Sequence, residues 1–215
     1  MSTVSLINER ELISRRVAKE IRDGMVINLG IGLPTMVADF IPDGMKVTLQ
    51  SENGILGMGP APAAGCEDKN VVNAGGKPVT ILRGASFFDS ATSFAIIRGG
   101  HVDLTVLGAL QVDSTGSLAS HIIPGKMVPG MGGAMDLVTG SKKVIVAMTH
   151  TAKGTPKILD KITLPATAVS GVDMIVTELC VFEVTPSGLR LTELADGVSV
   201  EDVRKVTVAD FVVAL

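Results

Sequence analysis

Short runs of mostly apolar residues recur along the chain, separated by segments with turn and helix signals. These runs lie at residues 25–29, 45–50, 79–82, 104–107, 144–148 and 174–184. Strands that expose one face alternate apolar and polar side chains, so runs that stay apolar are typical of strands buried on both faces. When such strands alternate with helices, they build a mostly parallel sheet covered by helices. The sequence therefore predicts an open α/β fold.

The intervening segments predict four short helices. The first is expected to begin after Asn8, which resembles a capping box together with Glu11, and to end by Gly24. The others are expected at residues 34–40, 89–98 and 201–205. Residues 51–65 are dense in Gly, Pro and Ala and predict an apolar loop. No repeat or linker interrupts the pattern, so residues 1–215 are expected to form a single domain.

Charge and cysteine content argue against several classes of function. The formal net charge is −3, whereas binding to nucleic acid or an anionic membrane needs clustered Lys and Arg. Cys66 and Cys180 are too few and too far apart for a disulfide framework or a metal cluster, so no metal site is expected. His101, His121 and His150 show no ligand spacing and are expected at the surface or in turns. Without a secretory signal or a long apolar segment, the protein is expected in the cytoplasm.

One carboxylate is notable for its position. Glu52 lies in LQSENGILG (49–57), where a predicted strand ends and a glycine-containing loop begins. Active-site residues of parallel sheets are usually found at such strand ends. No basic residue follows before Lys69, and a carboxylate among apolar groups is poorly solvated and therefore reactive. From position alone, a nucleophile and a Glu that caps a turn or pairs with a distant Arg are about equally plausible.

Two glycine-rich segments are candidates for binding anions through backbone N–H groups. Residues 28–34 (NLGIGLP) join a predicted strand to a predicted helix. Thr35 replaces the third glycine of a dinucleotide fingerprint, so a tight structural turn is the more common explanation. Residues 124–136 (PGKMVPGMGGAMD) are glycine-rich and apolar, and successive N–H groups there can converge as an oxyanion hole. A flexible connection is the alternative for this second segment.

Together these segments resemble the β subunits of family I coenzyme A transferases. LQSENGILG is similar to the glutamate signature of the family, and further similar segments cover nearly the whole chain. They are residues 28–42, 73–103, 106–113, 123–138 and 192–197. The resemblance is above all to the β subunits of 3-oxoacid (acetoacetate, butyrate or acetate) CoA transferases. It implies the CoA-transferase (NagB/RpiA-like) fold and an α subunit on a separate chain, usually assembled as an α2β2 heterotetramer.

The resemblance also implies roles for individual residues. Glu52 matches the catalytic glutamate, which carries CoA as a glutamyl thioester during ping-pong catalysis. The residues expected beside the thioester oxygen are Asn28, Gly132, Gly133 and Ala134. The residues expected to contact CoA are Gly30, Gly32, Asn53 and Gly54. Because CoA is a substrate of this reaction, no cofactor is expected.

The role of Lys77 and the identity of the substrate each have alternatives. Single-chain animal enzymes of the family have a lysine directly after NAG, where this sequence has Gly76 and then Lys77, so a contact between Lys77 and CoA is undecided. The acyl donor is expected to be acetoacetyl-, butyryl-, acetyl- or succinyl-CoA. Alternatives are a 3-oxoadipate or other dicarboxylate CoA transferase, an acyl-CoA hydrolase, and a non-catalytic module similar to sugar-phosphate sensors. The intact SENG signature counts against the last of these.

Overall fold

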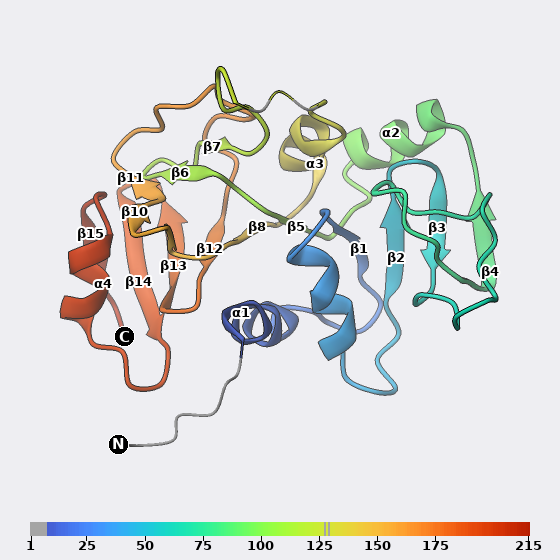
Figure 1. Ribbon diagram of the computed structural model, residues 1–215, viewed down its shortest axis with the longest axis horizontal. Helices are drawn as coiled ribbons and strands as arrows, with labels where there is room; N and C mark the ends of the chain where they lie inside the picture. The colour runs from blue at the N-terminus through green and yellow to red at the C-terminus, as the bar shows by residue number, and fades with distance from the viewer. Residues whose placement is uncertain (1–7, 127, 129) are drawn as a thin grey trace.

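The computed structural model describes residues 8–126, 128 and 130–215, and its main feature is one large twisted sheet (Figure 1). The strands of this sheet are β1 (Val26–Leu29), β2 (Thr48–Ser51), β3 (Ile55–Met58), β4 (Ile81–Phe87), β5 (Leu104–Leu107), β8 (Val144–Ala147), β12 (Met174–Val176), β13 (Cys180–Thr185), β14 (Gly188–Leu194) and β15 (Phe211–Val213). The helices are α1 (Glu9–Ala18), the 3-10 helix η1 (Pro34–Phe40), α2 (Ser90–Arg98), α3 (Ala134–Gly140) and α4 (Val200–Val206).

The strand order of the large sheet is β15-β14-β13-β12-β8-β5-β1-β2-β3-β4. Its centre, from β12 to β2, is parallel throughout. Antiparallel pairings flank this centre, and β15 at one edge returns to a parallel pairing with β14. After β1 the chain adds β2 on one side of that strand, and it later adds β5, β8 and β12 in turn on its other side. The direction of strand addition therefore reverses between β1 and β5. The predicted α/β fold with a mostly parallel sheet is confirmed.

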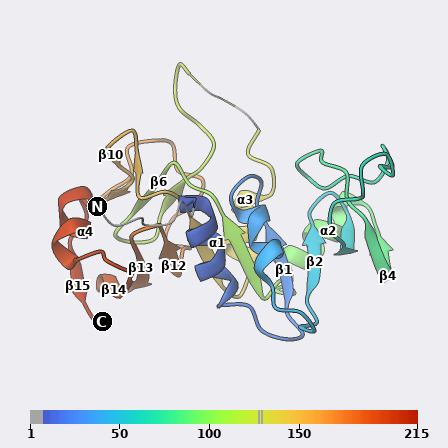
Figure 2. The same ribbon diagram turned by 60° about the horizontal axis from the view of Figure 1, so that its bottom comes forward.

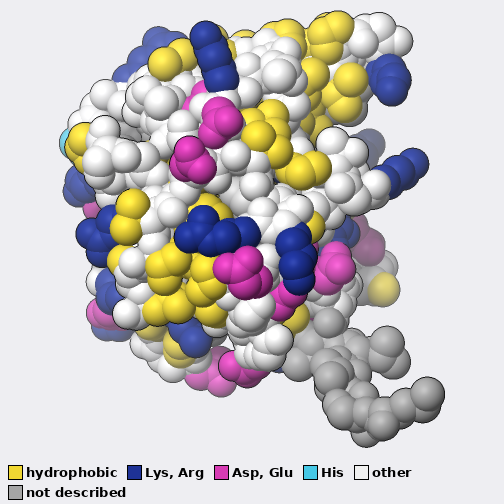
Figure 3. All heavy atoms as spheres, turned by 90° about the vertical axis from the view of Figure 1, so that its left-hand side faces the viewer, with side chains coloured by type: hydrophobic (Ala, Val, Ile, Leu, Met, Phe, Trp, Pro, Cys, Tyr) yellow, Lys and Arg dark blue, Asp and Glu magenta, His cyan; other side chains and the backbone are white. Residues whose placement is uncertain are grey.

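Five shorter strands form two small sheets beside the large one. β6 (Gln111–Asp113), β7 (Leu118–Ala119) and β11 (Ile158–Leu159) form a three-stranded sheet. β9 (Thr151–Ala152) and β10 (Thr155–Pro156) form a two-stranded one. Figure 3 shows the end of the molecule that carries α4 and β15, where hydrophobic side chains lie among charged ones. No helix of the described residues is long and apolar enough to span a membrane.

Two hydrophobic cores lie on opposite faces of the large sheet. α1 and η1 cover one face with side chains such as Val17 and Val37, and α2 and α3 cover the other with Ile97 and Leu137 (Figures 1 and 2). Successive residues of β8 alternate between the two cores, and all of them are buried. A strand covered on both sides has no solvent-facing positions, which is why the central runs are apolar without interruption.

Several elements differ from the sequence-based predictions. α1 ends at Ala18, well before Gly24, although Ile21 beyond its end is still buried. The run 174–184 is two antiparallel strands, β12 and β13, because the chain reverses between Thr177 and Cys180. The Thr177 N–H donates to the Cys180 carbonyl oxygen across this turn. The predicted loop 51–65 contains β3, which pairs with β2 and β4 despite its many Gly and Pro neighbours.

Side-chain caps begin two of the predicted helices. The Asp89 carboxylate accepts a hydrogen bond from the Thr92 N–H at 2.7 Å and begins α2. Ser199 and Asp202 form a reciprocal capping box at the start of α4. Side chains that satisfy the first free N–H groups of a helix fix where it starts, so these two predicted helices are confirmed.

Of the histidines expected at the surface or in turns, His121 and His150 lie at bends of the chain but are buried, so a surface position is wrong for both. The ring of His150 lies 3.0 Å from Thr177 Oγ1 through Nδ1 and 2.9 Å from Thr207 Oγ1 through Nε2. Burial lowers the pKa of His150 to about 4, and the positive charge of Lys157 contributes to this lowering. The imidazole is therefore neutral in the folded protein at neutral pH.

Acidification is expected to destabilise the fold through His150. The unfolded chain binds a proton at this histidine below pH 6.5, whereas the folded protein does so only near pH 4. The free energy of unfolding should therefore fall by about 3 kcal/mol as the pH drops through that window. Urea unfolding at pH 7 and pH 4.5 would measure the loss, with His150→Gln as a control that cannot titrate. An equally steep decline in the variant would contradict this assignment.

Candidate active site

Glu52 is the first of three residues that connect β2 to β3 in a tight hairpin. Ser51 pairs with Ile55, and the Gly54 N–H donates to the Ser51 carbonyl oxygen at 3.0 Å. Gly54 has φ +112°, and a Cβ atom there would lie 2.0 Å from the carbonyl oxygen of Phe88. Both facts require glycine at this position. The hairpin therefore holds Glu52 at the carboxyl end of β2, the outermost strand of the parallel centre on that side.

Asn28 contacts the Glu52 carboxylate from the neighbouring strand β1. Its Nδ2 donates to Glu52 Oε2 at 3.1 Å and to Gln50 Oε1 at 2.6 Å. β1 and β2 pair in register with Asn28 opposite Gln50, so both side chains lie on one face. That face is the one covered by α2, because Gln50 Nε2 donates to Ser93 Oγ of that helix at 3.0 Å. Asn28, Gln50 and Ser93 are all buried.

Gly133 contacts Glu52 from the start of α3. A Cβ atom at Gly133 would lie 3.3 Å from Glu52 Cγ and 3.5 Å from Phe94 Cζ, and the first of these distances is tighter than side chains normally pack. Its φ of −84° is open to any residue, so the close approach explains the glycine. Ala134 is the first residue of α3, and Gly132 lies exposed with φ +61°. The first turn of α3, whose N–H groups have no partner within the helix, is thus next to Glu52.

Three of the residues expected to contact CoA are explained by backbone packing or turn conformation. The Gly30 N–H donates to the Val106 carbonyl oxygen at 2.8 Å, and a Cβ at this glycine would lie 3.0 Å from the same oxygen. Gly32 is exposed with φ +92° in the turn before η1. These two glycines and Gly54 are therefore accounted for even without a ligand. Asn53 is exposed, and its Nδ2 donates to the Val72 carbonyl oxygen at 2.7 Å.

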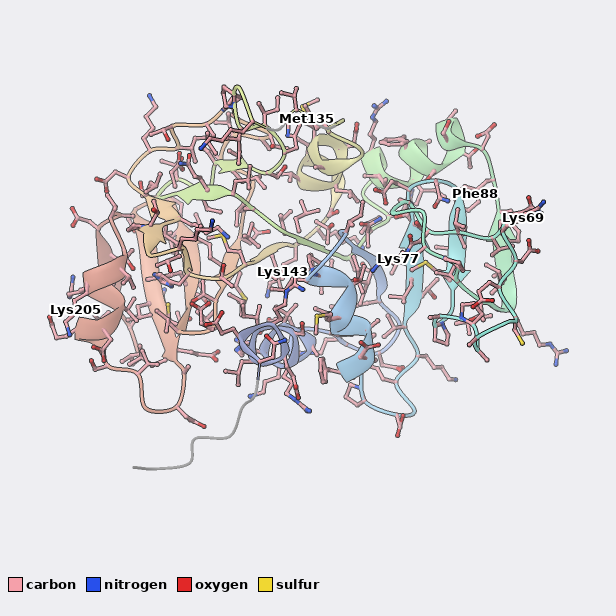
Figure 4. The ribbon with its side chains drawn as sticks, in the orientation of Figure 1. Lys69, Lys77, Phe88, Met135, Lys143 and Lys205 are labelled. Carbon is pink, nitrogen blue, oxygen red and sulfur yellow. The ribbon has the colours of Figure 1, made fainter. Side chains whose placement is uncertain are left out.

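Lys77 lies on the other face of the sheet from the Glu52 side chain. It lines a cavity of about 550 Å³ together with η1 residues such as Met36 and with Leu29 and Leu49. Leu29 and Leu49 adjoin the core beneath α1 and η1, whereas Asn28 and Gln50 face α2. Figure 4 labels Lys77 beside η1 and β1, and Phe88 and Met135 near α2 and α3.

The surroundings of Glu52 do not fit a structural ion pair. None of the ion pairs between residues that the structure describes includes Glu52, and Arg98 of α2 pairs with Asp136 at 2.6 Å. One carboxylate oxygen accepts from Asn28, and no donor of the described chain reaches the other. A carboxylate held by a neutral amide keeps a free lone pair, so the arrangement suits nucleophilic attack on a carbonyl carbon.

Gln50, Ser93 and Phe94 belong to this site, although the sequence analysis did not single them out. Gln50 lies on β2 two positions before Glu52, which directly follows the strand, and residues two apart on an extended chain share a face. That spacing was the one signal for Gln50. Ser93 and Phe94 come from a helix some 40 positions later, and local sequence carries no sign of where α2 crosses the strand ends.

Comparisons with known proteins place nearly the whole chain in one family. Residues 10–206 match the family model described as Coenzyme A transferase. The beta subunit of the acetate CoA-transferase of Escherichia coli (strain K12) is 57% identical over 209 residues, covering 97% of this chain and 95% of that protein. The B subunit of the succinyl-CoA:3-ketoacid coenzyme A transferase of Helicobacter pylori (strain ATCC 700392 / 26695) is 50% identical over 207 residues, covering 96% and 100%.

A solved structure is also similar. It is an acyl-CoA transferase from E. coli O157:H7 as a thioester complex with CoA, with a TM-score of 0.76 and 25% sequence identity. The match covers 99% of this chain but 43% of the solved chain, so this chain spans less than half of that protein's length.

Proposed function

Because this chain belongs to the coenzyme A transferase family, we propose that it is the catalytic β subunit of an enzyme that moves CoA between a short-chain acyl-CoA and a carboxylate. Glu52 is the nucleophile in this proposal. The observation that carries it is the convergence of Asn28 and the Gly133 backbone on the Glu52 side chain at the carboxyl end of β2.

The proposed reaction begins with attack of Glu52 on the acyl-CoA thioester. A Glu52 oxygen bonds to the acyl carbon, the carbon–sulfur bond breaks, and CoA leaves as a thiolate. The thiolate then attacks the glutamyl carbonyl of the mixed anhydride and releases the first carboxylate, leaving a glutamyl-CoA thioester. A second carboxylate reverses these steps and departs as the new acyl-CoA. This covalent route divides one difficult exchange into easier ones, with CoA as a substrate throughout.

Each step of this route passes through a tetrahedral oxyanion, which needs nearby hydrogen-bond donors. The Asn28 amide group lies beside the carboxylate, and the first turn of α3 after Gly133 also adjoins the Glu52 side chain. We assign Asn28 and the backbone N–H groups of Gly133 and Ala134 to stabilising this charge, with Gly132 shaping the approach to the helix. The solved relative that holds CoA as a thioester supports a thioester intermediate.

The proposal includes a separate α subunit, assembled as α2β2. The E. coli K12 and H. pylori relatives are themselves named as beta and B subunits. The solved acyl-CoA transferase has more than twice the length that this chain matches, so a second region accompanies the shared one there. Large exposed apolar side chains lie on elements near the candidate site, including Phe87 at the end of β4 and Met135 in α3. A second chain covering this surface would bury them and keep water from the anhydride.

The function is tested with this chain co-expressed with its α subunit. Acetyl-, acetoacetyl- and succinyl-CoA would serve as donors, and acetate, butyrate, succinate and acetoacetate as acceptors. The names of the relatives motivate acetate, succinyl-CoA and a 3-keto acid among these. Parallel lines in double-reciprocal plots are expected, because the first product leaves before the acceptor binds. Intersecting lines would contradict the proposal, and CoA release without any acceptor would identify a hydrolase instead.

A further inference from the structure

A buried chain of side-chain hydrogen bonds connects helix α2 to Glu52. Ser93 Oγ accepts from Gln50 Nε2 at 3.0 Å, and Gln50 Oε1 accepts from Asn28 Nδ2 at 2.6 Å. Asn28 Nδ2 in turn donates to Glu52 Oε2 at 3.1 Å. Ser93, Gln50 and Asn28 are each no more than 1% exposed, so water does not compete for these contacts. The chain of contacts runs from one helix through two strands to the nucleophile.

The direction of each hydrogen bond in this chain is fixed from the Glu52 end. The Asn28 amide faces a carboxylate oxygen and, at 3.3 Å, the backbone carbonyl oxygen of Gln50, and both can only accept. The N–H₂ end of Asn28 must therefore point toward them. The atom of Gln50 that faces this N–H₂ group must then be its oxygen, which turns Gln50 Nε2 toward Ser93. A hydroxyl oxygen can accept this last hydrogen bond.

Asn28 depends on Gln50 for its orientation. No residue that the structure describes donates a hydrogen bond to Asn28 Oδ1, although this atom is buried. The amide is therefore held by its nitrogen end alone. Leaving the buried oxygen without a partner costs about 1–3 kcal/mol. Apart from Glu52 itself, both acceptors at that end belong to Gln50, one from its backbone and one from its side chain.

We propose that Gln50, anchored by Ser93, is a positioning residue that holds Asn28 in the orientation required for attack by Glu52. This inference rests on the proposed function and adds two residues to that site. Gln50 does not reach the reacting atoms in this proposal, because its side chain ends in contact with Asn28 and Ser93. Its loss should therefore slow the chemical step and leave the affinity for acyl-CoA nearly unchanged.

The test measures how fast CoA becomes attached to Glu52 in the co-expressed αβ complex, using acetoacetyl-CoA in single-turnover mass spectrometry. Gln50→Leu keeps the volume and removes both polar ends, and the rate is expected to fall by about 10- to 100-fold, with the acyl-CoA concentration that gives the half-maximal rate within about twofold of the wild type. Ser93→Ala removes only the anchor and is expected to slow the rate by about threefold to tenfold. An unchanged rate in either variant would overturn the proposal, and Ser93→Ala decides alone if Gln50→Leu does not assemble.

Thr105→Val is the matched control for disturbing this buried region. Thr105 pairs with Asn28 across β1 and β5, is fully buried, and has no hydrogen-bond partner for its hydroxyl among the described residues. The valine variant should form the adduct at the wild-type rate. A loss as large as that of Gln50→Leu would show that any change in this layer slows the reaction, and would overturn the specific role of Gln50.

A second readout separates positioning from packing. Gln50→Glu has the shape of the wild type, and its protonated form offers the same pattern, an O–H toward Ser93 and a C=O toward Asn28. The ionised form instead adds a negative charge near Glu52. Adduct formation relative to wild type should therefore rise as the pH falls, and a flat ratio would overturn the proposal. If the wild-type complex forms no adduct at all, the proposed function fails, and the positioning role fails with it.

Discussion

Replacing Glu52 with glutamine is expected to lower kcat of the assembled enzyme by at least about four orders of magnitude. The glutamine has the same shape and its amide oxygen can still accept from Asn28, whose Nδ2 lies 3.1 Å from the carboxylate. It cannot form the anhydride, because a neutral amide is a poor nucleophile. Steady-state assays with acetoacetyl-CoA and acetate would measure the loss, and retention of more than about 1% of activity would contradict the assignment.

Glu52→Asp is the informative companion to this variant. The aspartate keeps the charge but retracts the carboxylate by one methylene, on the order of 1 Å, from Asn28 and from the start of α3. Misplacement of that size typically costs about 100-fold. An intermediate activity is therefore expected, because both a carboxylate and its position are required. An aspartate variant as active as the wild type would mean that the close contacts around Glu52 do not set its geometry.

The second large effect is expected at Gly133. Even one Cβ atom there would lie 3.3 Å from Glu52 Cγ, and the branched side chain of Gly133→Val would push further into the space of Glu52 and Phe94. Displacing the nucleophile relative to the first turn of α3 should lower kcat by about 100- to 1,000-fold. Because φ at Gly133 is −84°, the loss would come from this contact and not from backbone strain.

Gly108 provides the control for adding a Cβ atom at Gly133. Gly108 also lacks a positive φ, and a Cβ added there would meet none of the described atoms within 4 Å. Gly108→Ala should therefore retain wild-type turnover, whereas Gly133→Ala should lie between wild type and Gly133→Val. Equal activity of Gly133→Val and the wild type would show that contact between Glu52 and the start of α3 is dispensable.

Much of the fold was predictable because its central strands are buried on both faces. Residues 104–107 form β5 with the bounds that the sequence indicates, and residues 144–148 differ from β8 by one residue. Turns fixed by side-chain bonds and by strand pairing were harder to predict. The reversal at Thr177 depends on side-chain bonds to Cys180, and β3 depends on pairing with two strands across glycine-rich sequence.

The candidate site was predictable where its residues share a local motif or a family resemblance. Glu52 was indicated by its place after a strand, and the resemblance adds Asn28 and Gly133, which the fold then brings together. Gln50 and Ser93 could not be found in that way, because their role is defined by a contact between β2 and α2. The burial of His150 could not be predicted either, because the threonines that contact its ring, Thr177 and Thr207, are distant in sequence.

The most direct test of the central claim is mass spectrometry of the co-expressed complex after mixing with acetoacetyl-CoA and no acceptor. Glu52 as nucleophile predicts CoA covalently attached to the peptide that contains residues 49–57, and no adduct in Glu52→Gln. Addition of acetate should release the adduct as acetyl-CoA. Turnover without any adduct on that peptide, or an adduct that persists in Glu52→Gln, would contradict the claim.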